Sequence, residues 1–580
     1  EEAGLLVKEE KYDNAVSTCY RCGNAIEPFL SEQWFVKMDN LAAPAIKAVE
    51  SGAVQMHPES WKTPLLNWLK NIQDWCISRQ IWWGHRIPVW YCRKCCGAGL
   101  TFAEDKLGRE HLVKVAFEDG AQPILSQTQP ACPHCGGKDT VQDPDVLDTW
   151  FSSGLWPFSV FGWPKETGDL KHYYPTSVLV TGYEIIYLWV ARMIMMGIEF
   201  MGKPPFPHVF LNGIVRDKTG KKMSKSLGNV VDPLDLIKKY GADATRFSLL
   251  MQAAPGKDIP YGEDSVVGAR NFCNKIYNAA RFIQMNLEGI EKLPPLPEKP
   301  ADIFDGYIIN YYRHCAANAA AAIEEYEFSK AAGKLYKFFW NDFCDWYIEI
   351  AKTRLNDNKE NKEQILSILV NVLYGTLKAL HPMMPFITDE IAAGFKKYID
   401  GSQEFLINET YPAEGKYAAE YSATEEVTFL QDLITQVRTI RSQFNVHPAK
   451  NVDIFISSED PGAERIINDY RRYINLLAKV ENITLKDKNA PRPQKAATAV
   501  FGNTAVYIPL EGLIDFEKEN ARLAKELGVI ETGIANRTRM LGNENFTKNA
   551  APEQVAKAKE ELAQMQLKSA QIKEAIAGLK

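Results

Sequence analysis

The spacing of apolar residues changes near residue 260, and this change divides the chain into parts of different fold class. Before it, a short apolar run at 177–182 precedes a helical pattern at 184–197 and another short apolar run at 209–211. A strand, a helix and a further strand in this order are typical of a parallel sheet. After it, apolar residues recur at helical spacing from 265 to about 394, which predicts a helical bundle.

The region that follows the bundle mixes helical and strand patterns and predicts a small α/β module. Its expected elements are a long helix from about 427, a strand at 452–456, a helix at 461–480, and strands near 483–484 and 505–508.

The last part of the chain carries two apolar stripes at spacings of three, four and seven residues, which predict two helices that pack through these stripes. The stripe residues are Phe516, Leu523, Leu527, Ile530, Ile534 and Leu541, then Val555, Leu562, Met565, Ile572, Ile576 and Leu579. The stretch 542–552 between them is turn-forming, and Pro552 suits the start of the second helix. We therefore expect an antiparallel coiled coil.

Length and composition bound the protein class. A chain of 580 residues is too long for one hydrophobic core, so it should form several domains. With 46% hydrophobic residues and no apolar run near the roughly 20 residues that a bilayer span needs, we expect a soluble protein without a membrane segment. A net charge of −6 argues against bulk attraction to a polyanion, but local basic faces can still bind RNA.

Eleven cysteines, several in close pairs, suit reduced thiols and metal better than disulfides. We therefore expect a cytoplasmic protein. The first residues carry no basic or apolar segment of a signal peptide and resemble the middle of a longer chain.

Two cysteine pairs lie in one turn-rich stretch and predict a structural zinc site, because four thiolates meet the tetrahedral preference of Zn²⁺. The predicted ligands are Cys92, Cys95, Cys132 and Cys135. His134 competes as a ligand, although cysteine is favoured. A third pair, Cys19 and Cys22, either finds its partners outside this chain or binds no metal, and the sequence leaves both possibilities open.

The run from Gly220 to Asn229, Gly-Lys-Lys-Met-Ser-Lys-Ser-Leu-Gly-Asn, matches the KMSKS signature of class I aminoacyl-tRNA synthetases. When a carboxylate attacks the α-phosphate of ATP, negative charge builds on the departing pyrophosphate, and mobile ammonium groups stabilise it. The candidates for this catalytic role are Lys222 and Lys225, and the ATP-binding set adds Ser224 and Ser226. The alternative is a solvated lysine-rich loop, which the flanking matches disfavour.

Three further segments resemble the bacterial valyl-tRNA synthetase family, and the resemblance covers essentially the whole chain. They are 74–85, 148–153 and 182–193. An isoleucyl relative, the competing assignment, would usually have a more polar third segment and a zinc-bearing tail instead of a coiled-coil arm. The resemblance implies valine:tRNA ligase chemistry, in which ATP with Mg²⁺ activates valine to valyl-adenylate and tRNA(Val) accepts it, in a monomer.

The resemblance also implies binding residues. By matching positions, Trp83, Ile185 and Trp189 form walls of the amino-acid pocket, although such residues at helical spacing are more often plain core. Glu184 stands where the family more often has Asp, so its role is open.

A further match, at 269–282, corresponds to the entry of the family's anticodon-binding domain. Within about one helical turn, Asn278, Arg281 and Phe282 offer an amide, a cation and a stacking ring to splayed tRNA bases. The alternative is an amphipathic helix with Phe282 in the core. A run at 381–390 also resembles this domain, and we assign it to packing and helix capping.

The His-x-Gly-His signature, the second ATP-binding motif of the class, does not occur in the sequence. The resemblance therefore implies the C-terminal portion of such an enzyme, without that motif and without most of the editing insertion. Two hypotheses follow: part of a ligase that is inactive alone, or a shortened, non-catalytic tRNA-binding protein.

The expected fold is multidomain, α/β plus all-α. We expect the exit of the editing insertion at 1–30, the C-terminal half of a Rossmann-type catalytic domain at 31–260 with a zinc insertion at 91–140 and the lysine loop at 216–229, a helical anticodon-binding domain at 261–425, the small α/β module at 426–510 and a coiled-coil tRNA-binding arm at 511–580.

Overall fold

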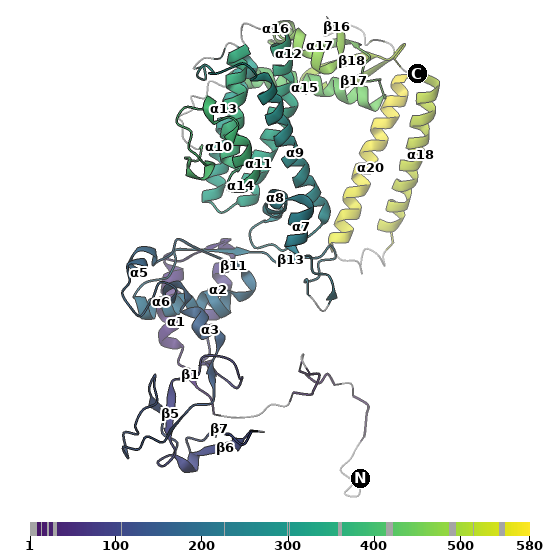
Figure 1. Cartoon of the computed structure of the whole chain (residues 1–580). Helices are drawn as coiled ribbons and strands as arrows, with labels where there is room; N and C mark the ends of the chain where they lie inside the picture. Colours follow the sequence, from purple (N-terminus) through teal and green to yellow (C-terminus); the bar gives the residue numbers. More distant parts are fainter. Residues whose placement is uncertain are drawn as a thin grey trace. The chain divides into compact units, whose positions relative to one another are not determined.

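The computed structural model of the chain forms two compact units (Figure 1). The N-terminal unit comprises residues 1–215 and 254–259, and the C-terminal unit comprises 216–253 and 260–580. The structure describes residues 8–12, 14–19, 22–26, 32–105, 107–224, 227–297, 300, 302–357, 362–412, 422–486, 493, 495–513, 516–543 and 552–579. Two residues of the predicted ATP site, Lys225 and Ser226, lie outside this range.

A parallel sheet organises the N-terminal unit. Its strands β2 (Gln55–His57), β11 (Val178–Gly182) and β12 (His208–Asn212) are ordered β11-β12-β2. In β11 the side chains of Leu179 and Thr181 are buried, whereas those of Val178 and Val180 are exposed, as expected for a strand with one covered face. The two predicted strands and their parallel pairing are confirmed.

The carboxyl ends of β11 and β12 lie side by side, because Gly182 is in register with Asn212. Asp258 joins the two segments that continue from these ends. Its carboxylate accepts a hydrogen bond from the Tyr183 hydroxyl at 3.0 Å and another from the Ile214 backbone N–H at 2.9 Å.

Helices cover the sheet and supply most of the core of this unit. They include α1 (Asp39–Glu50), α2 (Lys62–Lys70), α3 (Thr149–Gly154), α4 (Trp156–Ser159), α5 (Gly168–Tyr173) and α6 (Ala191–Met201). The helix predicted at 184–197 forms, but its first two segments are not α-helical. It begins as the 3-10 turn η3 (Tyr183–Ile185), continues through the π-helical segment η4 (Ile186–Val190), and becomes α-helical at Ala191. Every residue of α6 up to Gly197 is buried.

The cysteine-bearing segment has a small core of its own around Tyr91, Leu100 and Leu112. The strands β5 (Val89–Cys92), β8 (Ile124–Leu125) and β9 (Thr140–Gln142) form one sheet, and β6 (Leu100–Glu104) pairs with β7 (Glu110–Val115). Two short pairs precede or follow this segment: β1 (Phe35–Val36) with β3 (Trp75–Cys76), and β4 (Ser78–Arg79) with β10 (Val146–Leu147).

The C-terminal unit is built on helices, as the apolar spacing predicts. They are α7 (Pro233–Tyr240), α8 (Ala242–Gln252), α9 (Glu263–Asn286), α10 (Ile303–Glu324), α11 (Phe328–Lys337), the π-helical η6 (Phe338–Ile348), α12 (Glu349–Asp357), α13 (Lys362–Leu380) and α14 (Pro385–Ala393). Fully buried aromatic residues such as Phe272, Phe339 and Phe343 fill the space between them. The bundle prediction is confirmed.

A four-stranded sheet follows the bundle, in the order β16-β15-β18-β17. Its elements are α15 (Ser422–Gln443), β15 (Val452–Ser458), α16 (Ala463–Asp469), α17 (Arg471–Ala478), β16 (Val480–Leu485), β17 (Ala496–Phe501) and β18 (Thr504–Pro509). The long helix α15 and three of the strands agree with the predicted module.

Two details of that module differ from the prediction. The single helix expected at 461–480 breaks at Tyr470, whose backbone leaves the helical region at φ −111° and ψ 16°. The rings of Tyr470 and Tyr473 both pack against Phe304, so contacts with the bundle override the local helical pattern. The strand β17 was not expected, because it is rich in alanine. It forms through its ladder with β18, which supplies the pairing that local propensity does not.

Two long helices end the chain, α18 (Phe516–Leu541) and α20 (Pro552–Leu579), and they run side by side (Figure 1). Ion pairs join Glu526 to Lys568 and Arg537 to Glu561, so positions rise on one helix as they fall on the other. The antiparallel hairpin and the start of its second helix at Pro552 agree with the prediction. The turn predicted between the helices lies largely outside the described residues.

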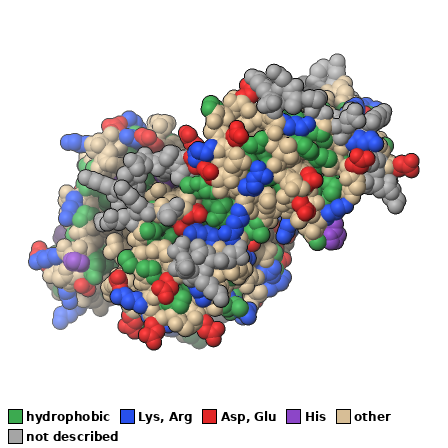
Figure 2. Space-filling view, turned by 90° about the horizontal axis from the view of Figure 1, so that it is seen from above, with side chains coloured by type: hydrophobic (Ala, Val, Ile, Leu, Met, Phe, Trp, Pro, Cys, Tyr) green, Lys and Arg blue, Asp and Glu red, His purple; other side chains and the backbone are tan. Residues whose placement is uncertain are grey.

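No helix in the described parts of the chain is both long enough and apolar enough to cross a membrane. Acidic and basic side chains are interspersed over the face shown in Figure 2, in keeping with a net charge of only −6.

A buried ion pair inside the bundle gives a test of the fold. The guanidinium of Arg354 donates to both carboxylate oxygens of Asp305, at 2.5 and 3.0 Å, and the side chains are 13% and 6% exposed. We expect Arg354→Ala to lower the free energy of unfolding by about 3–5 kcal/mol, because it leaves a buried carboxylate uncompensated. The matched control is Lys330→Ala, which breaks a pair that is 54% and 40% exposed and should cost less than about 1 kcal/mol. Urea unfolding measures both, and equal losses would contradict the prediction.

Candidate functional site

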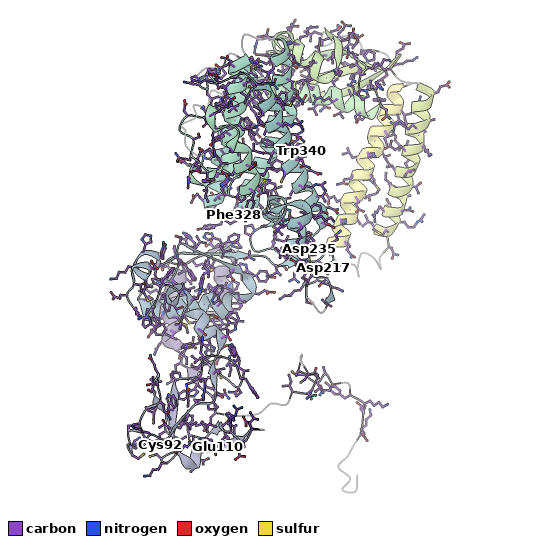
Figure 3. All side chains as sticks on the ribbon, in the orientation of Figure 1. Cys92, Glu110, Asp217, Asp235, Phe328 and Trp340 are labelled. Atoms are coloured by element: carbon purple, nitrogen blue, oxygen red, sulfur yellow. The ribbon has the colours of Figure 1, made fainter. Side chains whose placement is uncertain are left out.

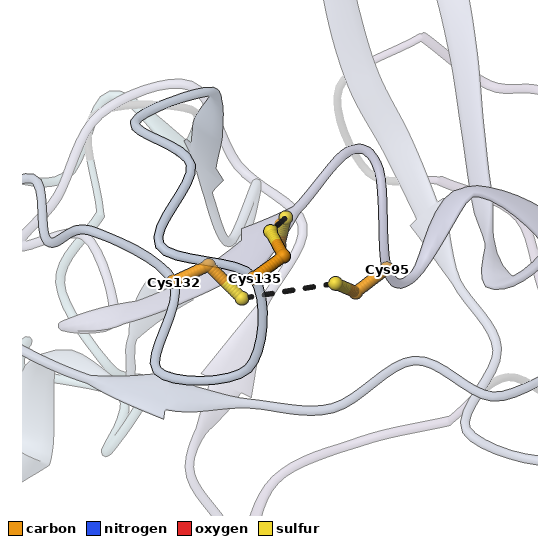
Figure 4. A group of neighbouring side chains, drawn as sticks. Cys95, Cys132 and Cys135 are labelled. Carbon is orange, nitrogen blue, oxygen red and sulfur yellow. Dashed lines mark hydrogen bonds between the residues drawn. The ribbon is translucent and has the colours of Figure 1, made fainter.

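Four cysteines converge in the N-terminal unit, as the sequence predicts. The sulfur atoms of Cys92, Cys95, Cys132 and Cys135 all lie within 4.8 Å of one another. The sulfur atoms of Cys92 and Cys135 are 3.7 Å apart. Those of Cys95 and Cys132, joined by a dashed line in Figure 4, are 3.8 Å apart. Cys92 and Cys132 are buried, whereas Cys95 and Cys135 are exposed. This is the donor set and the closeness that a tetrahedral metal ion requires.

Backbone turns hold each pair of cysteines. The N–H of Cys96 donates to the carbonyl oxygen of Cys92 at 2.8 Å, and the N–H of Gly136 donates to that of Cys132 at 2.9 Å. The second turn is closed by the N–H of Cys132, which donates to the carbonyl oxygen of Gly137. Gly136 takes a φ of +69°, a conformation that favours glycine.

The electrostatics of the cluster favour a cation. The pKa of Cys132 is lowered to about 6, chiefly by the hydrogen bond from the backbone N–H of Cys135. The pKa of Cys95 is raised to about 12, chiefly by its hydrogen bond with the thiol of Cys135. Four thiolates this close repel one another, so ionisation of all four requires a divalent ion between them. His134, the competing ligand, is not a member of the cluster found among the described residues.

The third cysteine pair has the same backbone turn as the Cys132 pair. The N–H of Cys19 donates to the carbonyl oxygen of Asn24, and the N–H of Gly23 donates to that of Cys19, both at 2.8 Å. Gly23 also has a positive φ of +74°. Within the described residues, Cys19 and Cys22 do not belong to a group of three or more metal-binding side chains. The local turn is therefore formed, while the question of a further pair of ligands stays open.

The lysine loop of the C-terminal unit is organised by Asp217. One oxygen of its carboxylate accepts hydrogen bonds from the backbone N–H groups of Thr219 and Lys221, each at 2.9 Å. The other oxygen accepts from the side-chain amide of Asn229 at 2.8 Å. These bonds, led by the one from Asn229, hold the pKa of Asp217 well below its usual range.

Asn229 ties the far end of the loop to its middle. Its side-chain oxygen accepts from the N–H of Ser224 at 2.9 Å, and its amide nitrogen donates to the carbonyl oxygen of Lys222 at 3.3 Å. We call these hydrogen bonds of Asp217 and Asn229 the loop brace. The side chain of Lys222 is exposed, so the brace acts on the backbone and leaves the ammonium group at the surface. Figure 3 labels Asp217 on this loop and Asp235 on α7.

Asp217 is not among the site residues expected from the sequence. The signal was present, because an Asp two residues before a Thr-Gly pair is typical of a turn in which the carboxylate accepts backbone N–H groups.

The structure places the three predicted pocket residues in different surroundings. Ile185 and Trp189 are partly buried on neighbouring turns of η3 and η4. The indole N–H of Trp189 donates to the carbonyl oxygen of Ser153 at 2.9 Å, and its ring packs against Trp156. Trp83 is 92% exposed, so its ring does not form a covered wall. The shared pocket stays a prediction, and Glu184 beside it is exposed.

The predicted tRNA-binding residues lie on α9. Asn278 and Arg281 are exposed one turn apart, whereas Phe282 is partly buried and packs against the bundle core. The ammonium group of Lys352 lies 5.4 Å from the centre of the Phe282 ring. Phe282 therefore packs against the core, as expected for an ordinary amphipathic helix, while part of its ring is exposed. Its role in tRNA binding stays a prediction.

The run at 381–390 packs against the bundle core through Met383 and Met384, as expected, but the capping role assigned to it is wrong, because no side chain of the run caps α14. Pro385 begins α14, and the cap comes from outside the run. The Asp243 carboxylate accepts the N–H of Ile387 at 2.6 Å and that of Phe386 at 3.3 Å.

Three family models match successive parts of the chain. Residues 7–261 match tRNA synthetases class I (I, L, M and V), residues 305–456 match the anticodon-binding domain of tRNA ligase, and residues 515–580 match the valyl tRNA synthetase tRNA binding arm. Together with the parallel sheet, the helical bundle and the terminal hairpin, these matches show that the chain belongs to the class I tRNA synthetases.

Curated relatives narrow the family. The chain is 42% identical to the valine–tRNA ligase of Symbiobacterium thermophilum, over 97% of this chain and 61% of the relative. It is 42% identical to that of Thermotoga maritima, over 97% and 60% respectively. The chain is a member of the valine–tRNA ligase family, and it spans about 60% of the length of these relatives.

A solved structure of Mycobacterium tuberculosis methionyl-tRNA synthetase in complex with methionyl-adenylate is also similar. It is 16% identical over 66% of each chain, with a TM-score of 0.49.

The brace in the lysine loop can be tested by amide hydrogen exchange. We expect Asp217→Ala to speed exchange at Thr219, Lys221 and Ser224 on the order of tenfold, because the carboxylate that orders the loop is removed. Asp235→Ala is the matched control, since this exposed carboxylate on α7 forms only a loose 3.9 Å pair with Lys238. Unchanged protection in Asp217→Ala would show that the loop is ordered by other contacts.

The same brace should resist mild acid. Because the folded pKa of Asp217 is depressed, its contribution is fully present above the ordinary aspartate pKa and is lost only as the pH falls through the lower, folded value. Protection of the loop amides, after correction for intrinsic exchange, should therefore persist below pH 4, roughly the ordinary aspartate value. Loss of protection already near that value would contradict the assignment.

Proposed function

We propose that this chain supplies the lysine loop, part of the amino-acid pocket and the tRNA-binding parts of a valine:tRNA ligase. In that reaction ATP activates valine to valyl-adenylate, and tRNA(Val) accepts the valyl group. The observation that carries the proposal is the 42% identity that extends over 97% of the chain, together with a terminal arm that matches the valyl model.

The lysine loop would act on ATP bound with Mg²⁺. The ammonium groups of Lys222 and Lys225 would stabilise the charge that develops on pyrophosphate, and the hydroxyls of Ser224 and Ser226 would donate to phosphate oxygens. The brace from Asp217 and Asn229 supports this role. It fixes the backbone on both sides of the signature while the side chain of Lys222 stays exposed.

The pocket walls would be Trp83, Ile185 and Trp189. The side chain of valine carries no polar group, so rigid apolar side chains select it by shape. The position of Ile185 and Trp189 directly after the carboxyl end of β11 supports this role, because ligands of open parallel sheets bind at that edge. Trp83 would have to be covered by substrate or by additional polypeptide.

For tRNA, the proposed contacts are Asn278, Arg281 and Phe282 on α9, together with the terminal hairpin. The exposed amide and guanidinium beside a partly open ring support base recognition by hydrogen bonding and stacking. We expect the protein to act as a monomer.

Valine-dependent exchange of pyrophosphate into ATP tests the proposal. The chain covers about 60% of its relatives, so we expect the 580 residues alone to be inactive. They should become active when joined behind the N-terminal part of the Thermotoga maritima relative. Exchange with isoleucine instead of valine would overturn the specificity. Tight tRNA(Val) binding without exchange in the joined protein would favour the non-catalytic alternative.

Within the joined protein, Lys222→Ala should lower kcat for exchange roughly a hundredfold, because one charge donor to the transition state is removed. Lys238→Ala, an exposed lysine on the neighbouring helix α7, is the control and should leave kcat unchanged. A decrease confined to KM would show that Lys222 contributes to ground-state binding only.

We also propose that the four-cysteine cluster holds one structural Zn²⁺. A closed set of four thiolates leaves no position open for chemistry, so the ion would stabilise the fold of the segment and take no part in the reaction.

Metal analysis of the purified chain should give about one zinc per molecule. Cys132→Ser should lose it and unfold the segment, because three thiolates hold the ion poorly. Cys96→Ser is the matched control: Cys96 is buried next to the cluster but outside it, with its sulfur 3.7 Å from the carbonyl oxygen of Gln122. Zinc retained in Cys132→Ser would contradict the ligand assignment.

A further inference from the structure

A partly open cavity of about 390 Å³ lies in the N-terminal unit, between the Val36–Leu41 segment and helix α6. Its walls are mostly apolar and include Met38, Leu41, Trp75, Phe151, Met196 and Phe200. This volume is within the range of small-molecule sites. The predicted amino-acid pocket residues Trp83, Ile185 and Trp189 do not line it, so the cavity is separate from that pocket.

The polar group in the buried wall of this cavity is the guanidinium of Arg192. Arg192 lies on α6 and is only 7% exposed. Its guanidinium carbon lies 3.9 Å from the ring centre of Trp75 and 5.3 Å from that of Trp68. The indole faces therefore cover the flat side of the guanidinium, and its N–H donors point along the edges.

Those donors are poorly satisfied by the described residues. The hydrogen bond of Arg192 runs to the sulfur of Met38 at 3.7 Å, and a thioether is a weak acceptor. Within the described part of the chain no carboxylate forms an ion pair with it. The nearby Asp148 is engaged by Arg79 at 2.9 Å and by the Trp75 indole at 3.0 Å.

Burial lowers the pKa of Arg192 to about 10, so the group remains protonated at neutral pH. The Asp148 carboxylate offsets part of this decrease but forms no ion pair with Arg192 among the described residues, so the buried cation stays costly, and a bound anion would reduce that cost.

The surroundings indicate which anion. The planar fork of the guanidinium matches a carboxylate through two parallel hydrogen bonds. A dianionic phosphate would bring a second negative charge into an apolar cavity that offers one buried cation. Lys37 and Glu199, the other charged lining residues, are exposed and opposite in sign. A monoanion with an apolar body fits both the charge and the walls.

We propose that this cavity binds a hydrophobic monocarboxylate, with the carboxylate paired to Arg192 and the apolar body packed against Trp75, Phe151 and Phe200. The proposal does not depend on the proposed function, because it concerns a different set of residues. The carboxylate could belong to a free small molecule or to an acidic side chain of a polypeptide, and both present the same group to Arg192.

Isothermal titration of the 580-residue chain tests the site with isovalerate and 4-phenylbutanoate as probes, each against its uncharged amide. We expect saturable binding of the acids, with the larger acid bound more tightly and each acid favoured over its amide by about tenfold or more. Equal affinity for acid and amide, or no saturable binding of either acid, would overturn the proposal.

Substitutions then assign the anchor. Arg192→Met replaces the guanidinium with an apolar side chain of similar length and should weaken acid binding about tenfold or more. Arg192→Lys keeps the charge but loses the planar fork, so its affinity for the acids should lie between those of the unaltered chain and Arg192→Met. Arg109→Met removes an exposed arginine that pairs with Asp105 in the β6–β7 hairpin, and it should bind like the unaltered chain. Undiminished acid binding by a folded Arg192→Met chain would refute the role of Arg192.

Near-UV circular dichroism establishes that each variant is folded. Should Arg192→Met fail to fold, Leu41→Trp provides a second test, because it fills the cavity and leaves Arg192 in place. Acid binding should then be lost, and binding that persists would place the ligand elsewhere. An acetylated and amidated Leu-Glu-Leu peptide distinguishes the source: tighter binding than 4-phenylbutanoate assigns the carboxylate to a polypeptide, and weaker binding assigns it to a small molecule.

Discussion

The parallel pairing of β11 and β12 is the constraint on which the N-terminal unit depends. Because Gly182 is in register with Asn212, the segments that leave the two strands start side by side, and Asp258 joins them through Tyr183 and Ile214. Parallel strands require a crossover, and here the crossover is the continuous helical segment from Tyr183 to Met201. That one segment carries Ile185 and Trp189 at its start and the buried Arg192 further along. The pairing of the strands therefore decides where the predicted pocket and the apolar cavity lie.

In the lysine loop and at the cysteine pairs, polar and charged groups are held by local backbone turns. Asp217 and Asn229 accept and donate within the lysine loop, and the cysteine turns use backbone N–H groups to stabilise the Cys132 thiolate. Such turns need only a few residues of suitable type, because a short side chain can replace one backbone partner. This is why a surface loop of mixed charge can have a defined shape without a hydrophobic core.

How much of this could be predicted follows from the distance in sequence between the interacting groups. The bundle, the terminal hairpin and the two parallel strands were predictable, because the spacing of apolar residues within 5 to 30 positions, roughly the length of one element, indicates each of them. The break at Tyr470 and the strand β17 were not, because Phe304 and β18 impose them from other parts of the chain. For the site, the spacing Cys-x-x-Cys was enough to predict a convergence of four sulfurs across about 40 residues.

By itself, the sequence determined the types of element, the Cys-x-x-Cys pairs and the lysine signature, because local spacing and residue chemistry suffice for these. Only the tertiary structure decided that Trp83 is exposed while Trp189 is held by Ser153, and that Arg192 is buried between two indoles beside an apolar cavity. In the sequence, Arg192 is one charge in an apolar run. Its environment is set by Met38, Trp68 and Trp75, which lie more than 100 positions away and meet it only after the sheet and its helices have packed.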